Sequence, residues 1–211
     1  PIQSKPLRTI VYIDGFNLYY RSLKKTPYKW LDLFKMSSLL LPPEKHDIIS
    51  IKYFTARISV NKLSKLTEGP DAPTRQDIYL RAIRKHCPIL TIIEGISLHI
   101  LQTGHCTVKV LLTEEKGTDV NLAVHFLNDA WNNKFDCGVL VSNDSDLAEC
   151  LRLVRELNKT IGWLIPGDDH HSKKLSRYVT FKKEIRKNVL AKSQLPDIIP
   201  GTSIQKPSAW H

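Results

Sequence analysis

No apolar stretch of the sequence approaches the roughly 20 residues that a membrane-spanning helix needs. The first ten residues, PIQSKPLRTI, have no apolar core of the kind found in signal peptides. The four cysteines form no C-x-x-C pair and share no metal-ligand spacing with the eight histidines. We therefore expect a cytoplasmic protein with no membrane association, no disulfide and no zinc site.

Two patterns of enzyme chemistry are also missing. The sequence contains no G-x-S-x-G, the turn that carries the serine nucleophile of α/β-hydrolases. It also contains no G-x-x-x-x-G-K-[ST], the loop that holds nucleotide phosphates in P-loop enzymes. These absences exclude both classes, so any catalysis must depend on other polar side chains.

Positive charge is what the sequence has in excess. Its 211 residues include 31 Lys and Arg but 21 Asp and Glu, which gives a net charge of +10. With 42% hydrophobic residues, the chain can bury a core of its own. A basic surplus favours an anionic partner, and nucleic acid is the first candidate, although many basic proteins bind none.

Short apolar runs and amphipathic segments alternate along the chain, as in βαβ units with a mostly parallel sheet. The runs predict strands at residues 9–14, 48–57, 88–98, 107–117, 135–142 and 160–166. The amphipathic segments predict helices at residues 16–25, 75–87, 118–132 and 144–157, with Thr74 and Thr118 as N-caps. We expect one domain at 8–181, with 160–166 as its last strand, followed by a C-terminal basic helix and extension at 182–211.

An acidic residue ends the first expected strand. Ile10 to Ile13 form a run that should be buried on both faces, yet the next residue is Asp14. A desolvated carboxylate is costly unless it is paired, hydrogen-bonded or bound to a cation. Asp14 therefore needs a specific partner.

Two further acidic segments open helices. Asp119 stands in the first turn of the helix at 118–132, three residues before Leu122, so we expect it on the buried face. Asp144 and Asp146 open the helix at 144–157 and should lean toward its inner side for the same reason. Each of these acids could also simply cap its helix or favour the helix dipole.

The acids become informative when they are considered together. The carboxyl ends of parallel strands meet at one edge of an α/β sheet, so Asp14, Asp119, Asp144 and Asp146 should gather there. Carboxylates in one crevice repel each other unless a cation is present, and all-oxygen ligands suit Mg²⁺ or Mn²⁺. Such an ion lowers the pKa of water and stabilises charge on a phosphate under attack. We therefore interpret the four acids as metal ligands.

Three stretches, YIDGFNLYY, EEKGTDVNLA and VLVSNDSDLAECLRLVRE, together resemble the NYN family of the PIN-like nuclease superfamily. The resemblance extends over roughly residues 8–190, and the trailing KPSAW is similar to the LabA-like branch. It implies a PIN-like three-layer α/β/α sandwich with a central, mostly parallel sheet. It also implies a Mg²⁺- or Mn²⁺-dependent endoribonuclease that hydrolyses RNA phosphodiester bonds.

The resemblance further implies roles for individual residues. The catalytic set would be Asp14, Asn17, Asp119, Asp144 and Asp146, with the four aspartates as metal ligands. Ser142 would brace the second acidic loop. Many PIN nucleases have one more acid in the middle of the chain, and no residue here stands out in that role, so both one and two bound ions stay open.

An RNA substrate, single-stranded or structured, needs cationic and polar contacts beside acids that would otherwise repel it. We expect such contacts from Asn17, Arg57, Arg75, Lys116, Ser142 and Asn143. Arg57 is the first choice, because it ends a strand at the same sheet edge. Tyr19, Tyr20 and Trp30 could stack on bases, although packing in or around the core is the commoner role of such residues.

A second hypothesis keeps the fold without the catalysis. A regulatory RNA-binding module would have the same sheet and the same positive charge, but it would gain by losing acids that repel phosphate. The complete acidic set therefore favours the nuclease. The sequence is compatible with a homodimer as well as with a monomer.

Overall fold

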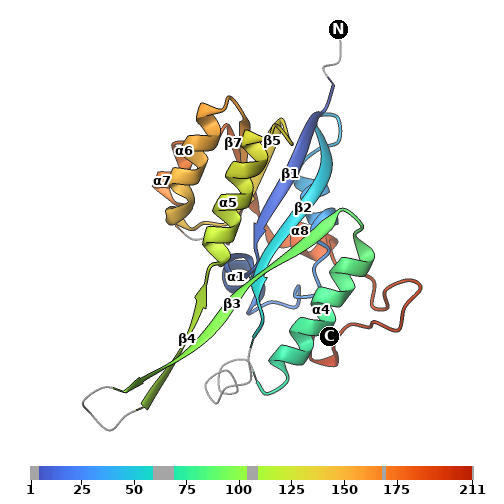
Figure 1. Cartoon of the computed structure of the whole chain (residues 1–211). Coiled ribbons are helices and arrows are strands. Elements are labelled where there is room, and N and C mark those ends of the chain that lie inside the picture. The colour runs from blue at the N-terminus through green and yellow to red at the C-terminus, as the bar shows by residue number, and fades with distance from the viewer. Residues whose placement is uncertain (1–4, 59–68, 104–108, 168–169, 211) are drawn as a thin grey trace.

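The computed structural model describes residues 5–58, 69–103, 109–167 and 170–210, and it is built around a seven-stranded sheet (Figure 1). The strands, in their spatial order, are β4 Lys109–Lys116, β3 Leu90–Thr103, β2 His46–Ala56, β1 Leu7–Asp14, β5 Cys137–Val141, β6 Thr160–Pro166 and β7 Phe181–Ile185. The six strands from β3 to β7 are parallel, whereas β4 pairs antiparallel with β3. The expected mostly parallel sheet is confirmed.

Helices cover both faces of the sheet. They are α1 Gly15–Leu18, α2 Leu33–Leu40, α4 Ala72–His86, α5 Thr118–Trp131, α6 Ala148–Glu156, α7 Lys173–Ser176 and α8 Lys187–Lys192, with a π-helical turn η1 Tyr19–Leu23 and 3₁₀ turns η2 Ser145–Leu147 and η3 Ser208–Trp210. In Figure 1, α5, α6 and α7 lie together on one face, and α4 lies on the other. The fold is therefore the expected α/β/α sandwich.

Alternation along β1 divides the core between the two faces. Val11 and Ile13 belong to the cluster that includes residues of α2, α4 and α8, whereas Ile10 and Tyr12 belong to the cluster with α5, α6 and α7. All four side chains are buried, because a parallel strand with helices on both sides needs apolar residues at every position. Asp14 follows at the point where β1 leaves this core.

Two expectations about helix starts are wrong. The N-cap of α5 is Gly117, whose φ of 92° suits glycine, and Thr118 is the first helical residue. Helix α4 begins at Ala72 behind the N-cap Asp71, ahead of the expected cap Thr74. A proline in the first turn tolerates this earlier start, because the backbone N–H that it lacks would have no partner within the helix.

The start of the C-terminal tail is a strand rather than a basic helix, so 160–166 is not the last strand. Phe181–Ile185 form β7, which pairs in parallel with β6, and α8 begins at Lys187. Charged side chains are normal on an edge strand, and backbone pairing with β6 decides the structure here. The sheet thus extends beyond residue 181, where we expected the domain to end.

The rest of the tail returns to the body of the protein. The Nε1 atom of Trp30 donates a hydrogen bond to the carbonyl oxygen of Pro196 (2.9 Å), and the rings of Trp30 and Trp210 have centroids 6.2 Å apart. Trp30 is fully buried. Its role is therefore packing in the core.

In the part of the chain that the structure describes, no helix is long and apolar enough to span a bilayer. Cys87, Cys137 and Cys150 are buried free thiols, whereas Cys106 lies outside the described residues. Burial raises the pKa of Cys137 and of Cys150 to about 12, so both thiols stay protonated and unreactive near neutral pH.

Candidate active site

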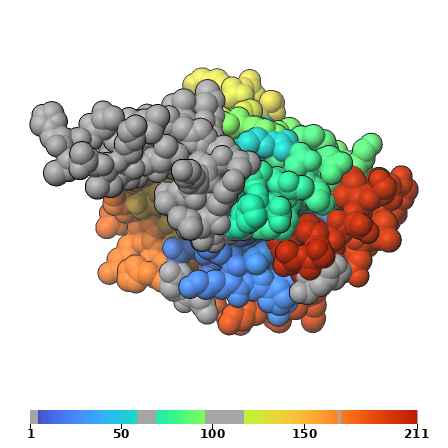
Figure 2. All heavy atoms as spheres, turned by 90° about the horizontal axis from the view of Figure 1, so that it is seen from below, coloured from blue at the N-terminus to red at the C-terminus, as the bar shows by residue number. Residues whose placement is uncertain are grey.

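The four acids come to the carboxyl edge of the sheet. Asp14 is the last residue of β1, and Ser142 directly follows β5, its parallel neighbour. Asp144 and Asp146 belong to the loop and the η2 turn after β5, and Asp119 lies in the first turn of α5. Figure 2 looks onto the molecule from this end, with the blue segment after β1 beside the green residues of α4 and the red C-terminal residues.

Asp14 is buried, with 4% of its surface exposed, and both of its carboxylate oxygens accept hydrogen bonds from neutral groups. The backbone N–H of Asn17 donates to Oδ1 (2.9 Å), which caps α1, and the hydroxyl of Ser142 donates to Oδ2 (2.9 Å). Ser142 Oγ in turn accepts from the N–H of Asp144 (3.1 Å). The loops after β1 and β5 therefore hold Asp14 in one position.

The surroundings of Asp14 oppose its ionised form. Burial raises the pKa of its carboxyl to about 6, while the two hydrogen bonds act in the opposite direction and the negative charges of Asp119 and Asp144 add to the rise. Burial and the charges of Asp144 and Asp146 likewise raise the pKa of Asp119. The acids are thus close enough to repel one another, which favours a cation between them.

The acids differ in exposure. Asp144 is half-buried and caps η2, because its Oδ1 accepts a hydrogen bond from the N–H of Asp146 (2.9 Å). Asp146 is exposed, and so is Asp119, which we had expected on the buried face of α5. Asp119 lies in the first turn of that helix, three residues before the buried Leu122. Its carboxylate is nevertheless partly desolvated. Capping, the simpler role, applies to Asp14 and Asp144 in addition to their clustering.

Two asparagines join the loops around the acids. The Oδ1 atom of Asn17 accepts a hydrogen bond from the N–H of Asn143 (3.0 Å). The side chain of Asn143 donates to the carbonyl oxygen of His170 (2.7 Å) and accepts from the N–H of Ser172 (2.9 Å). Asn143 thus braces a loop with both polar atoms of its side chain, whereas the Nδ2 donor of Asn17 is the atom that a substrate can use.

The basic residues expected at the substrate are placed differently from the acids. Arg57 is exposed and forms ion pairs with Asp77 of α4 and Glu94 of β3, each with a contact of 2.9 Å. It therefore links these elements. It follows β2, whose Phe54 pairs with Asp14, and its contact with a substrate stays a prediction. Arg75 lines a pocket that begins directly after β1. The side chain of Lys116 lies outside the described part of the chain.

Sequence reasoning missed two residues that shape the site. Nε1 of Trp163 in β6 donates to the carbonyl oxygen of Ser142 (2.6 Å) and so supports the loop that holds Asp14. A buried tryptophan needs a partner for its N–H, but the strand TIGWLIP does not indicate which. Gly15 lets the ring of Tyr53 lie against the backbone, and the glycine in YIDGF was the available signal for such a close approach.

The donors of the acidic cluster fit a hard divalent cation. All four acids offer oxygen atoms. Burial is the main cause of the raised pKa values of Asp14 and Asp119, and the charges of neighbouring acids add to both shifts. Among the residues that the structure describes, no three acidic, His or Cys side chains already surround one metal position. Each capping oxygen of Asp14 and Asp144 has a second lone pair, so capping is compatible with cation binding.

Comparisons with known proteins agree with this fold. The sequence model of the NYN domain family matches residues 8–182. A curated Pseudomonas putida protein named 6-hydroxy-3-succinoylpyridine 3-monooxygenase HspA is 33% identical over 245 residues, covering 100% of this chain and 77% of that protein. A solved structure of a protein of unknown function from Vibrio parahaemolyticus has a TM-score of 0.54 at 15% identity, and the match covers 91% of this chain and 98% of that one. This last likeness concerns the fold alone.

Proposed function

Because the chain belongs to the NYN domain family, which is a PIN-like nuclease family, we propose that it is a Mg²⁺- or Mn²⁺-dependent endoribonuclease. The observation that carries the proposal is the gathering of four aspartates at one edge, where burial and mutual repulsion raise the pKa of Asp14 to about 6. Such an edge attracts a divalent cation. The assignment of the chain to the LabA-like branch of the family stays a prediction.

The residues of the edge have separate roles in this proposal. The four aspartates would hold the cation, which supplies activation of water and offsets charge on the phosphate. Ser142 and the backbone N–H of Asn17 keep the two oxygens of Asp14 in place, so that little reorientation is needed when the substrate binds. The Nδ2 group of Asn17 would donate to a phosphate oxygen, and Asn143 would keep that side chain oriented.

RNA as the partner is supported by the charge of the whole chain. An acidic edge repels phosphate unless positive charge surrounds it, and the net charge of +10 provides that field. Arg75 lines the pocket that starts beside Asp14 and adds one cationic side chain to it. We propose RNA rather than DNA on the basis of the family, and a cleavage assay with both nucleic acids distinguishes them.

The test is a cleavage assay on end-labelled single-stranded and duplex RNA and DNA, with Mg²⁺, with Mn²⁺ or with EDTA. We expect cleavage of RNA that needs the cation and falls at least about hundredfold in Asp14→Asn, because a ligand and its charge are lost. Asp136→Asn is the matched control. Asp136 precedes the opposite end of β5 and pairs with Arg8 (2.8 Å), so its loss should leave cleavage unchanged.

Each other outcome of this assay has a definite reading. Full cleavage by purified Asp14→Asn would reject the proposed site. Salt-sensitive RNA binding without any cleavage by the wild type would favour the non-catalytic RNA-binding module. Cleavage that continues in EDTA would reject the requirement for a divalent cation.

A second candidate function comes from the curated relative. That protein's name describes a monooxygenase acting on a pyridine ring that carries an acid side chain, and the match covers 100% of this chain and 77% of that protein. A pocket lined with aromatic side chains beside Asp14 is the structural feature that favours this candidate. Its test is incubation with 6-hydroxy-3-succinoylpyridine, ¹⁸O-labelled dioxygen and a two-electron reductant. Mass spectrometry should find one labelled oxygen in a ring product that has lost the succinoyl group, because position 3, where the oxygen enters, carries that group. An unchanged substrate would reject it.

A further inference from the structure

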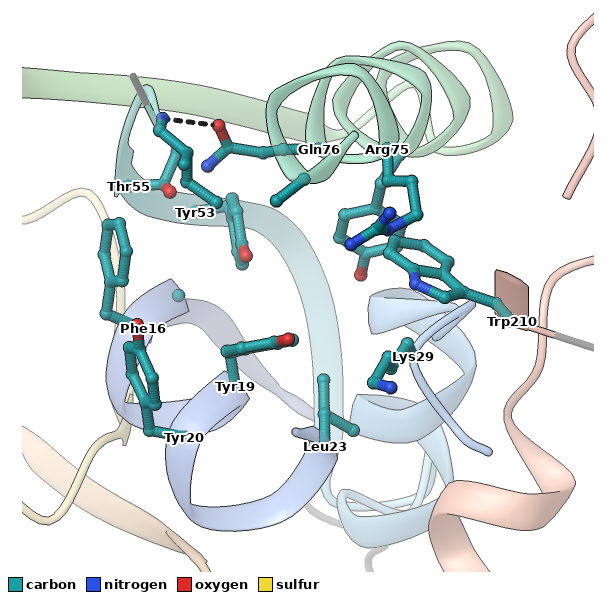
Figure 3. A pocket seen from close by; sticks show the side chains of 14 residues that line it. Phe16, Tyr19, Tyr20, Leu23, Lys29, Tyr53, Thr55, Arg75, Gln76 and Trp210 are labelled. Carbon is teal, nitrogen blue, oxygen red and sulfur yellow. Dashed lines mark hydrogen bonds between the residues drawn. The ribbon is translucent and has the colours of Figure 1, made fainter. Parts of the chain in front are cut away.

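A pocket rich in aromatic side chains, the aromatic pocket, begins where the acidic edge ends (Figure 3). Residues of α1, η1, β2, α4 and η3 form it. Its lining includes Gly15 and Phe16, the two residues after Asp14, and also Trp210 near the other end of the chain. An occupant of the pocket is therefore a close neighbour of the acids.

The contact between Gly15 and Tyr53 fixes one side of the aromatic pocket. A Cβ atom at residue 15 would lie 2.6 Å from Cζ and from the hydroxyl of Tyr53, and 2.7 Å from the carbonyl oxygen of Phe54. A larger residue would displace the ring or the strand. Glycine at this position thus keeps an aromatic ring against the backbone one residue away from Asp14.

Aromatic rings form the two facing sides of the pocket. Phe16 and Tyr20 are stacked, with centroids 6.3 Å apart and an interplanar angle of 16°. On the other side, Trp210 packs against Tyr79 (6.1 Å), which packs against Tyr53 (6.5 Å). Tyr20 is 54% exposed, so a group that arrives from solvent can reach it. Surfaces of this kind bind planar rings by stacking.

Positive side chains lie at the end of the pocket away from the acids. Figure 3 shows Arg75 and Lys29 on the side of Trp210, opposite Tyr20. At the other end, Lys24 places its ammonium 4.8 Å from the centroid of the Tyr20 ring. Aromatic surfaces next to cationic groups are the combination that single-stranded nucleic acids bind, through their bases and their phosphates.

We propose that the aromatic pocket receives one unpaired nucleobase of the RNA, next to the phosphate that is cleaved. The inference rests on the proposed nuclease function and deepens it, because it selects single-stranded RNA as the substrate. A base within a duplex is paired and stacked, so it reaches such a pocket only after it is unstacked.

The test measures binding rather than turnover. Fluorescence anisotropy gives the affinity for a labelled single-stranded RNA in Ca²⁺ and in EDTA, and a gel run after each titration verifies that the RNA is intact. The proteins are the wild type, Tyr20→Ala, Tyr20→Phe and Trp131→Ala. Trp131 is the matched control, because it is 75% exposed on α5 and does not line the aromatic pocket.

We expect Tyr20→Ala to weaken binding roughly five- to hundredfold, the range found when an aromatic residue that stacks on a base is removed. Tyr20→Phe keeps the ring and should bind like the wild type, as should Trp131→Ala. Removing the base at one position of the RNA should weaken binding to the wild type by the same factor. That abasic RNA should then bind Tyr20→Ala no more weakly than the intact RNA does.

Other results would overturn the inference in identifiable ways. Wild-type affinity in Tyr20→Ala, additive losses from the variant and the abasic position, equal affinity for duplex RNA, or no RNA binding would each reject the nucleobase. Displacement of a bound small aromatic acid, without any effect on RNA, would assign the pocket to that acid. Cation-dependent cleavage together with wild-type RNA affinity in Tyr20→Ala would reject the nucleobase pocket but support the nuclease function. Binding that depends on the base, without any cleavage, would support the nucleobase pocket but reject the nuclease function.

Discussion

Asp14 and Asp129 are both buried aspartates, yet their surroundings are opposite. Asp129, on α5, is 1% exposed and is contacted by Lys52, by Lys134 (3.1 Å) and by the hydroxyl of Tyr12 (2.8 Å). Burial by itself would raise the pKa of Asp129, but hydrogen bonds from Lys52 and Tyr12 and the ion pair with Lys134 outweigh it and lower the pKa. Asp14 has neutral donors and acidic neighbours, and its pKa is raised to about 6.

Under the proposed function, this difference separates an acid that serves the fold from an acid that binds a cation. The charge of Asp129 is compensated by lysines of the same chain, so no cation from solution is needed to balance it. The charge of Asp14 is opposed by its surroundings, and a cation from solution would compensate it. Burial alone would not have distinguished the two residues. The sign of the pKa shift does.

The largest effect on stability should come from Asp129→Ala. Removing one partner of a buried ion pair leaves the other charge uncompensated, and Lys52 has a side-chain exposure of 16%. We expect a loss of about 3–5 kcal/mol in the free energy of unfolding, measured by urea denaturation at pH 7. Glu149→Ala, which removes an exposed ion pair with Arg152, is the control and should change little.

The stability due to Asp129 should also depend on pH. Because folding lowers the pKa of this carboxyl, its contribution is fully present above the ordinary pKa of an aspartate, and it is lost as the pH falls through the folded-state value. The difference between the wild type and Asp129→Ala should therefore shrink in acid. A difference that stays constant from neutral pH into acid would contradict the ion-pair explanation.

Asp14→Asn should have the opposite sign in metal-free protein. The folded-state pKa is raised to about 6 from 3.8, so the wild type should lose stability as the pH rises between those values. Near pH 7.5 we expect the variant to be more stable by about 2–3 kcal/mol, and near pH 3.5 the two should be equal. Urea denaturation in EDTA at both pH values measures this. If Asp14→Asn were less stable than the wild type at pH 7.5, ionised Asp14 would stabilise the fold as Asp129 does, and the two acids would not differ.

The smallest effect should come from Tyr12→Phe. The substitution removes the hydrogen bond to Asp129 and retains the stacking of the ring on Phe126, whose centroid is 4.2 Å away at 14°. Since both lysines remain, we expect a loss of about 1–2 kcal/mol in the free energy of unfolding. A loss as large as that of Asp129→Ala would mean that the hydroxyl, rather than the lysines, compensates the carboxylate.

Positions that depend on a single strand or helix could be predicted from the sequence. The ends of β1 and β5 follow from apolar runs, so the sequence predicted that Asp14 and Ser142 would lie at the same sheet edge. Contacts between segments that are far apart in the chain could not be predicted from the sequence. The partners of Arg57 lie 20 and 37 residues away, on α4 and β3, and no periodicity indicates them.

Two further misses have the same physical origin. Lys182, Lys183 and Glu184 read as part of a charged helix, because the sequence does not show that β6 offers an unpaired edge. The aromatic pocket needs Tyr53, from β2, and Trp210, which lies more than 150 residues further along the chain. Each side chain alone resembles an ordinary packing residue. Only the folded chain brings them together.

Gly15 joins two sets of residues that otherwise come from different segments. The acids belong to the end of β1, the start of α5 and the loop after β5, whereas the aromatic pocket belongs to α1, η1, β2, α4 and η3. Because the two sets lie on different elements, a substitution in one set need not displace the other. A lineage could thus alter the ring that it recognises or the reaction that it performs, one at a time. This independence would let one family contain nuclease domains and also a relative whose name describes the oxidation of a pyridine.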